Sequence, residues 1–342
     1  MMKNCREGRS TDFFWIPTIN FFLYNKPMQT LSSFYESIFG CKTYKISLDA
    51  GCTCPNRDGT KGRGGCIFCS QQGSGDFVAG RNFTISEQIE QGKKLVEAKV
   101  RGRSGERQGK YIAYFQSFTS TYGDAGVLLE KYREALNCEG VAGLAVATRP
   151  DCLGDEILQG LADISKTHFV QIELGLQTSS EETGRLINRC YSNQDYIDAV
   201  RRIRETAPNI HIVTHLIFGL PGESEKDMLN SVMFVVDCHT VPVVAVPEPV
   251  EGVATTRAAC YGLKITSLYI LQNTPLAAMN EKGEYEPLTK DEYFVLLEKA
   301  LPLLPSNCVV HRLTGDPPKK LLIAPAWPAD KKRVLNELSK LL

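Results

Sequence analysis

The sequence has no net charge, no long apolar run and too few cysteines for a disulfide scaffold. Its 39 Lys and Arg balance 39 Asp and Glu, so the overall charge does not indicate a nucleic-acid binder, although a local basic face is still compatible with one. No apolar run is long enough to cross a bilayer, and we expect no association with membranes. Twelve cysteines in 342 residues are too dilute for a disulfide-stabilised protein. The 43% of hydrophobic residues instead indicates a globular protein with a sizeable core.

The apolar segment at 13–24 does not fit a signal peptide. Its sequence, FFWIPTINFFLY, follows a weakly basic start, but Pro17 interrupts it and no small-residue cleavage site follows. It is also too short to span a bilayer. We therefore predict a poorly ordered N-terminal extension over residues 1–30, a body that begins near Met28, and a cytoplasmic protein.

Four of the cysteines lie in one polar loop, LDAGCTCPNRDGTKGRGGCIFCS (48–70). Such clustering indicates metal binding rather than disulfide bonds. A zinc site normally takes four ligands from two paired clusters, whereas this loop has a single CxxC pair, Cys66 and Cys69, with no second CxxC or HxxxH in reach. Together with Cys54, three thiolates suit a four-iron cluster whose remaining iron is free for a non-protein ligand. The loop glycines would let the backbone wrap such a cluster closely.

Around this loop, short apolar runs alternate with segments of helical spacing. The apolar runs predict strands at 43–50, 111–118, 143–149, 169–177, 210–220 and 263–271, and a last short strand is expected at 308–315. Helices are predicted at 84–100, 125–137, 154–165, 193–206, 224–237 and 289–304. The strands lack polar alternation, as parallel strands covered on both faces do. Repeated strand–helix units of this kind imply right-handed crossovers.

These units predict an α/β fold, a partial (βα)6 TIM-like barrel with its functional groups on loops at the carboxyl ends of the strands. The segment 238–262 breaks the rhythm, because its prolines argue against a regular element. We interpret it as an irregular insertion between the first part of the barrel, 31–237, and a region 263–342 that holds the last barrel strand and a C-terminal α/β extension.

The cysteine loop, the aromatic Phe68 just before its last cysteine and the barrel rhythm resemble the radical S-adenosylmethionine (SAM) superfamily. The gap between the first two cysteines is wider than in the common CxxxCxxC pattern, and is similar to that of a bacterial subgroup of uncharacterised radical SAM proteins related to the Elongator catalytic subunit. Further motifs that fit this subgroup are TRPDCL (148–153), IELGLQT (172–178), FGLPGE (218–223) and HRLTGD (311–316). The resemblance covers about Leu31 to Leu342, apart from the insertion.

The resemblance implies an enzyme with two cofactors. Cys54, Cys66 and Cys69 would hold a [4Fe-4S] cluster, and the open iron would chelate the amino and carboxylate groups of SAM. An electron from a reductant such as flavodoxin or ferredoxin would then cleave SAM to methionine and a 5′-deoxyadenosyl radical that abstracts hydrogen from a substrate. Cys52 is either a stand-in ligand or a bystander, and the resemblance assigns the first ligand to Cys54.

The resemblance also implies contacts to SAM. Gln177 and Arg189 match a pair that contacts SAM in the related oxygen-independent coproporphyrinogen oxidases, and an arginine can fork onto the SAM carboxylate. Gln116 occupies the strand end where the superfamily binds the methionine amino group, and Phe68 belongs to the same set. His215 falls where those oxidases carry an Asp near the ribose. The alternatives are a surface charge for Arg189 and an ordinary strand-end polar residue for Gln116.

The substrate is less constrained by the sequence. His311, Arg312 and Asp316 in HRLTGD form either a polar cluster at a substrate mouth or an ordinary turn with a solvated Asp. Kinship to the Elongator subunit suggests tRNA, and the basic stretch 93–110 would suit phosphate, although a solvated helix end explains its charge more simply. The alternative function is a zinc-stabilised binding protein that uses the same thiols without radical chemistry.

Overall fold

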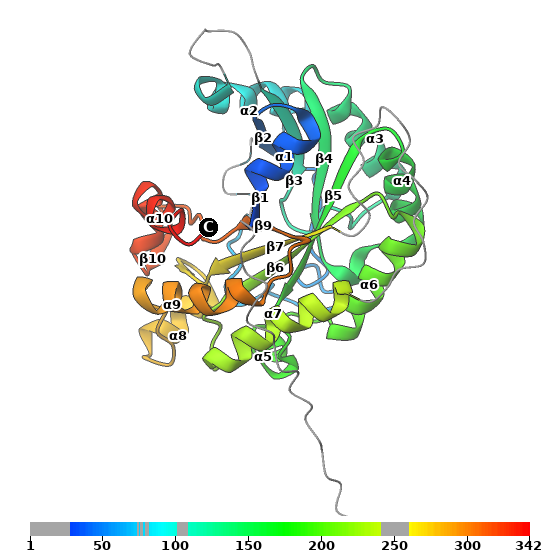
Figure 1. The fold of residues 1–342 in the computed structure, drawn as a ribbon. Coiled ribbons are helices and arrows are strands. Elements are labelled where there is room, and N and C mark those ends of the chain that lie inside the picture. Colours follow the sequence, from blue (N-terminus) through cyan, green and yellow to red (C-terminus); the bar gives the residue numbers. More distant parts are fainter. Residues whose placement is uncertain (1–27, 74, 76–77, 79–81, 101–108, 241–259) are drawn as a thin grey trace, which may run out of the picture.

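A curled parallel sheet forms the centre of the protein (Figure 1). The structure is a computed structural model that describes residues 28–73, 75, 78, 82–100, 109–240 and 260–342. The eight strands of the sheet are β1 (Gln29–Thr30), β2 (Thr43–Leu48), β3 (Lys110–Phe115), β4 (Val141–Thr148), β5 (Phe169–Gln177), β6 (His211–Phe218), β7 (Tyr261–Ser267) and β9 (Cys308–Arg312). Their order is β1-β9-β7-β6-β5-β4-β3-β2, so β2 and β1 form the two edges. The predicted partial barrel is confirmed, and the short strand expected near residue 308 extends the same sheet.

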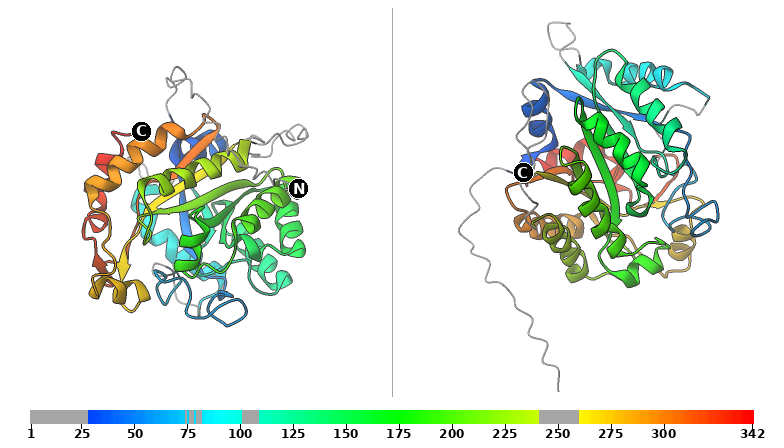
Figure 2. Two further views of the ribbon diagram at one scale, coloured as in Figure 1. Left: turned by 90° about the horizontal axis from the view of Figure 1, so that it is seen from below. Right: turned by 90° about the vertical axis from the view of Figure 1, so that its right-hand side faces the viewer.

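Amphipathic helices cover the outer face of this sheet. They are α2 (Ile85–Val100), α3 (Ala125–Leu136), α4 (Asp155–Ser165), α6 (Asn193–Thr206), α7 (Glu225–Thr240) and α9 (Lys290–Ala300). Helix α3 illustrates the cause: its buried residues, Leu128, Leu129, Tyr132, Ala135 and Leu136, recur on one face at helical spacing. The side chain of Asp124 caps its first turn by accepting from the Val127 amide at 2.9 Å. The two views in Figure 2 show the helices around the outside of the sheet.

Helix α1 (Leu31–Phe39) instead packs inside the curl, in contact with β1, β2 and β9. A capping box between Thr30 and Ser33 starts it, and Gly40, with φ of +68°, ends it. The sequence analysis placed no helix here and extended the irregular N-terminal segment to residue 30. In the structure, Gln29 and Thr30 pair in parallel with Val309 and Val310, so the ordered body includes them.

The region after β7 builds the C-terminal extension. It holds α8 (Pro275–Glu281), α10 (Lys331–Leu338) and a two-stranded antiparallel sheet of β8 (Ile270–Leu271) and β10 (Leu322–Ala324). The strand predicted at 263–271 is therefore two strands, of which only β7 belongs to the barrel. The helix predicted at 289–304 ends at Ala300, where a 3-10 turn with Pro302 at its centre follows.

The predicted insertion lies for the most part outside the described residues. Helix α7 runs on to Thr240 and β7 begins at Tyr261, so Cys238–Thr240 and Tyr261–Gly262 belong to regular elements. Residues 241–259 are not described, and the insertion stays a prediction. None of the described helices has the length and apolar character needed to span a membrane.

Candidate active site

The cysteine loop follows β2 and lies at the carboxyl ends of the strands, as predicted. Cys54, Cys66 and Cys69 line a single cavity of about 200 Å³, which we call the thiol cavity. Tight turns shape the loop, with the amide of Cys69 donating to the carbonyl of Cys66 at 3.0 Å. At Gly65, φ is +79° and an added Cβ would lie 2.8 Å from the Arg57 side chain, so glycine is strongly favoured at this position.

Two side chains donate toward the sulfurs. Asn56 Nδ2 lies 3.8 Å from Cys66 Sγ, and Arg149 Nη1 lies 3.9 Å from Cys54 Sγ. Burial, together with the nearby Cys69 and Cys54, raises the pKa of Cys66 to about 12. Cys66 therefore resists ionisation unless a metal compensates the charge of its thiolate.

The three thiols fit a cluster better than a single ion. Among the described residues, no three His, Cys, Asp or Glu side chains converge on a point where one metal ion would be held. A four-iron cluster takes its thiolates on separate irons, so it needs no such convergence. Donors aimed at the sulfurs, here Asn56 and Arg149, are also a common feature around such clusters.

Four of the other predicted residues line the thiol cavity: Phe68, Gln116, Gln177 and His215. Gln116 comes directly after β3, and its amide donates to Ser47 Oγ at 2.8 Å. Gln177 ends β5 in the left-handed region, with φ of +64°, a conformation that non-glycine residues hold only where the surroundings enforce it. His215 lies 2.9 Å from Thr266 Oγ1, and burial beside Lys264 keeps its pKa well below the usual range, so the ring is neutral.

The structure does not support a SAM contact for Arg189. Its side chain is fully buried and does not line the thiol cavity. Its guanidinium group donates to the carbonyl oxygens of Tyr191, Leu176 and Thr178 and to the side-chain oxygens of Glu181 and Asn193. These contacts occupy all five N–H donors, so none is left for a ligand.

Arg149, to which the sequence analysis gave no role, lines the thiol cavity together with Arg57. It follows β4 in the motif TRPDCL, and a fork onto Asp151 at 2.8 and 2.9 Å holds it. Both Arg149 and Arg189 lie over the ring of Tyr191, at 4.8 and 4.9 Å from its centre. The sequence analysis assigned the SAM contact to Arg189. In the structure Arg149 lines the cavity, and Arg189 lies on the same ring but outside the cavity.

Cys52 belongs to the core rather than to the site. It is 5% exposed and packs in the main hydrophobic cluster beneath the loop. Because the thiol cavity is lined by the other three cysteines of the loop, the position of Cys52 agrees with the assignment of the first ligand to Cys54.

A buried charged group, which the sequence analysis did not include, lies below the thiol cavity. Glu173 is 4% exposed, and its carboxylate accepts from Lys45 at 2.5 Å, Tyr114 at 2.6 Å and Gln171 at 2.8 Å, with Lys264 at 3.5 Å. Burial by itself raises the pKa of Glu173, but the charges of Lys45 and Lys264 outweigh it and hold this pKa well below the usual range. Burial lowers the pKa of Lys264 to about 8 against the attraction of Glu173. We call Lys45, Tyr114, Glu173 and Lys264 the charged layer.

His311, Arg312 and Asp316 line a second cavity, of about 260 Å³, which we call the lateral cavity. The two cavities share Gln116 and three members of the charged layer, Tyr114, Glu173 and Lys264. The three residues of HRLTGD therefore lie next to the thiol cavity, on the far side of the charged layer. This placement suits the substrate-mouth interpretation better than an isolated turn.

The basic stretch 93–110 is only partly described. Lys93 is 7% exposed, pairs with Glu90 at 2.5 Å and lies over the ring of Tyr111, so it does not face solvent. Residues 101–108 lie outside the described part of the chain. Lys94 and Lys110 in the described parts of the stretch are exposed, and a phosphate-binding surface here stays a prediction.

Comparison with known proteins shows the family of the chain. Residues 56–235 match the model of the radical SAM superfamily, and residues 260–342 match the Radical_SAM C-terminal domain. The uncharacterised protein YtqA of Bacillus subtilis is 37% identical over 315 residues, which cover 92% of this chain and 89% of that protein.

Two further matches are more distant. A structure of Elp3 from the archaeon Methanocaldococcus infernus has a TM-score of 0.57 at 16% identity, covering 87% of this chain and 63% of the other, which shows a shared fold. The tRNA-2-methylthio-N(6)-dimethylallyladenosine synthase of Acetivibrio thermocellus is 30% identical over 139 residues, or 40% of this chain and 29% of that enzyme.

Proposed function

This chain belongs to the radical SAM superfamily, and we propose that Cys54, Cys66 and Cys69 bind a [4Fe-4S] cluster beside a site for SAM. The observation that carries the proposal is that the three thiols line one cavity together with Phe68, Gln116, Gln177 and His215. Two N–H donors directed at the sulfurs, from Asn56 and Arg149, support it. The enzyme class follows from the family, whereas the ligands and cofactors are the proposal.

When bound, the cluster and SAM would supply reductive cleavage of SAM to methionine and a 5′-deoxyadenosyl radical. The protein's own residues hold the reactants and exclude water. Gln116 and Gln177 offer amide groups at the ends of β3 and β5 for the polar end of SAM. His215, kept neutral by burial, offers a hydrogen bond to a ribose hydroxyl without adding charge. Arg149 places a fixed positive charge next to Cys54, which offsets negative charge on its thiolate.

The test is anaerobic reconstitution with iron and sulfide, followed by dithionite and SAM. We expect wild-type protein to bind four irons per chain and to release 5′-deoxyadenosine, measured by chromatography. Cys66→Ala should lose the cluster absorbance, and its release of 5′-deoxyadenosine should fall to background. Cys52→Ala is the matched control from the same loop and should retain both.

Two results would contradict the proposal. If cluster-loaded wild-type protein releases no 5′-deoxyadenosine, the proposed radical chemistry is wrong. One zinc and no iron in protein purified without oxygen would support a zinc-stabilised binding protein instead.

We further propose that the substrate is a tRNA, that the reductant is a flavodoxin or ferredoxin, and that the enzyme works in the cytoplasm. The support is the partial similarity to a tRNA-modifying synthase and the shared fold with an Elp3 protein. The measurement is a comparison of nucleosides from bulk tRNA of cells with and without the gene. Identical nucleoside profiles would count against tRNA as the substrate.

A further inference from the structure

The lateral cavity opens where the curled sheet does not close. It takes Lys45 and Ser47 from β2, one edge of the sheet, and Arg312 from the opposite side. In the described residues, β1 pairs with β9 only at Val309 and Val310, so β9 itself is the edge at Arg312. Helix α1 contacts both β2 and β9, and its first residue, Leu31, lines the cavity beside members of the charged layer.

The cavity has an excess of positive charge. Three cations, Lys45, Lys264 and Arg312, line it together with two carboxylates, Glu173 and Asp316. Both lysines share the one carboxylate of Glu173, at 2.5 and 3.5 Å.

Asp316 does little to neutralise this excess. Its carboxylate lies 2.5 Å from Lys331 in α10, but 3.5 Å from Arg312. Arg312 therefore has N–H donors left over, and its only ion pair within the described residues is this longer one.

Such an excess distinguishes a ligand site from a purely structural ion cluster. Buried charges are tolerated when each has a partner. Lys45 and Lys264 are largely buried and share one carboxylate, whereas Arg312 is 39% exposed and therefore accessible to a ligand. Here the surplus lines a cavity, and rigid strands hold two of the cations in place. A bound anion would supply the missing partner for Lys264 and Arg312, whereas a neutral or cationic group would leave the surplus uncompensated.

We propose that the lateral cavity binds an anionic group of the substrate, a carboxylate or a phosphate, through Arg312 and Lys264. The inference rests on the proposed function, because Lys264 lines both cavities and would place the anion beside the SAM site. The part of the substrate attached to the anion would then extend across the charged layer toward the thiol cavity. Held by a charge at one end, a substrate would present one carbon to the radical.

The experiment measures binding without turnover. The cluster-loaded full chain is titrated by calorimetry at constant ionic strength with uridine 5′-monophosphate and with succinate. Uridine and succinamide serve as the neutral counterparts. We expect at least one anion to bind about tenfold or more tightly than its neutral counterpart, as a charge-assisted hydrogen bond predicts. Tighter binding of the nucleotide would identify a phosphate as the source, and tighter binding of succinate a small organic acid.

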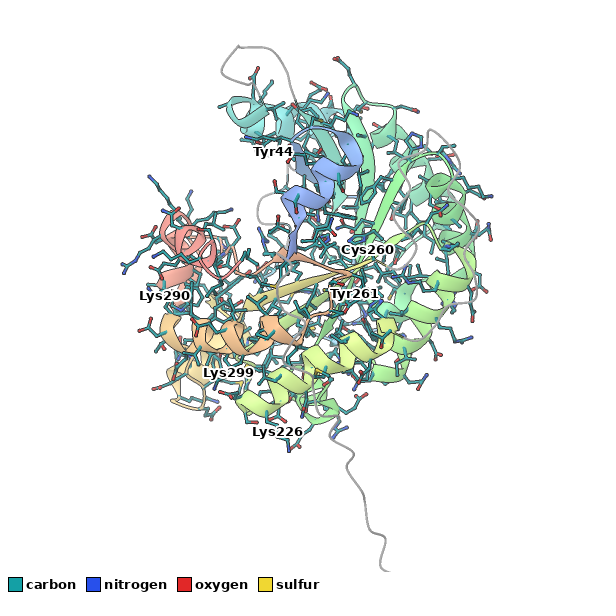
Figure 3. All side chains as sticks on the ribbon, in the orientation of Figure 1. Tyr44, Lys226, Cys260, Tyr261, Lys290 and Lys299 are labelled. Carbon is teal, nitrogen blue, oxygen red and sulfur yellow. The ribbon has the colours of Figure 1, made fainter. Side chains whose placement is uncertain are left out.

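Variants then locate the binding. Arg312→Gln should weaken the preferred anion about tenfold, Arg312→Lys should weaken it less, and Lys264→Met should also weaken it. Arg312 is 39% exposed, so its variants should fold. The control is Lys299→Met, since Lys299 lies on the outer face of α9 in a pair with exposed Glu225 (Figure 3). It should leave binding unchanged.

Two results would overturn the proposal: no preference for either anion over its neutral counterpart, or equal binding by Arg312→Gln and wild type. Neither result depends on SAM cleavage. If the protein binds the anion through Arg312 but releases no 5′-deoxyadenosine, the proposed function fails and the anion site stands. If the protein cleaves SAM but shows no anion preference, the proposed function stands and the anion site fails.

Discussion

At the amino ends of the strands the inside of the curled sheet is filled by packed rings, whereas at the carboxyl ends it is hollow. The filled end, which we call the closed end, holds Phe34 and Phe39 of α1 against Phe169 and His211, with ring centres 4.5 to 6.3 Å apart. At the hollow end, which we call the open end, the thiol cavity is lined by loop residues and strand-end polar groups. The charged layer separates the two.

The two ends of this sheet therefore have different roles, stability at the closed end and ligand binding at the open end. Packed aromatic rings exclude water and contribute stability through buried area. At the open end, backbone turns and hydrogen bonds hold the side chains in place, which leaves space for ligands. We therefore expect substitutions at the closed end, and of Glu173 in the charged layer, to change mainly stability. Substitutions at the open end should change mainly the chemistry.

The largest effect is expected in the charged layer. Glu173→Ala would leave Lys45 and Lys264 buried without a carboxylate, and we expect the free energy of unfolding to fall by about 4 kcal/mol. Urea unfolding measures it. The matched control is Glu225→Ala, whose exposed pair with Lys299 should contribute little. Equal losses in the two variants would show that the layer is not a stabilising ion network.

At the closed end, Phe34→Ala should lower the free energy of unfolding by about 3 kcal/mol, because it opens a cavity among fully packed rings. Urea unfolding again measures the loss, with Val295→Ala on the exposed side of α9 as the control. Iron bound per chain after reconstitution should match wild type. A loss of iron without a loss of stability would contradict the proposal that the closed end contributes stability and the open end contributes the chemistry.

Near the open end, burial raises the pKa of Glu223 to about 7, although its hydrogen bond with Thr178 acts against this. A carboxyl group with a raised pKa in the folded state binds its proton more tightly there than in the unfolded chain. Its contribution to stability is thus complete below about pH 4.5 and is lost as the pH rises through 7.

Glu223→Gln should remove this dependence, which we expect to be about 2 kcal/mol between pH 5 and pH 8. Thermal unfolding across that range measures it. Glu225→Gln, in the same segment, should keep the wild-type profile. A pH profile of Glu223→Gln that still matches wild type would show that another group titrates.

The smallest effect concerns the two arginines over Tyr191. Arg149→Lys would remove the donor that lies 3.9 Å from Cys54 Sγ, and we expect the reduction potential of the bound cluster to fall by up to about 60 mV, a tenfold change for one electron. A redox titration followed by electron paramagnetic resonance measures it. Arg189→Lys is the control, since Arg189 contacts only protein groups in the described structure and should change stability alone. Equal shifts in both variants would contradict the distinction between the two arginines.

The sequence carried more information about the fold than about the site. Runs of apolar residues without polar alternation identified six parallel strands, because both faces of such strands are covered. Helix α1 was missed because it is only nine residues long and its partners, such as Phe169 and His211, are distant in the sequence. The sequence does contain a signal for the charged layer. Glu173 and Lys264 are each a charged residue inside an otherwise buried strand, and Lys45 lies in the half-buried strand β2.

By itself, the sequence determined the parallel α/β architecture and the loop that carries the cysteines, because periodicity and the spacing of thiols are local properties of a chain. Only the tertiary structure decided which side chains face the same space. In the folded protein Arg149 rather than Arg189 lines the thiol cavity. Lys45, Glu173 and Lys264, from three different strands, form ion pairs. The physical reason is that the direction of a side chain and its partners depend on the curl of the whole sheet, which no short segment encodes.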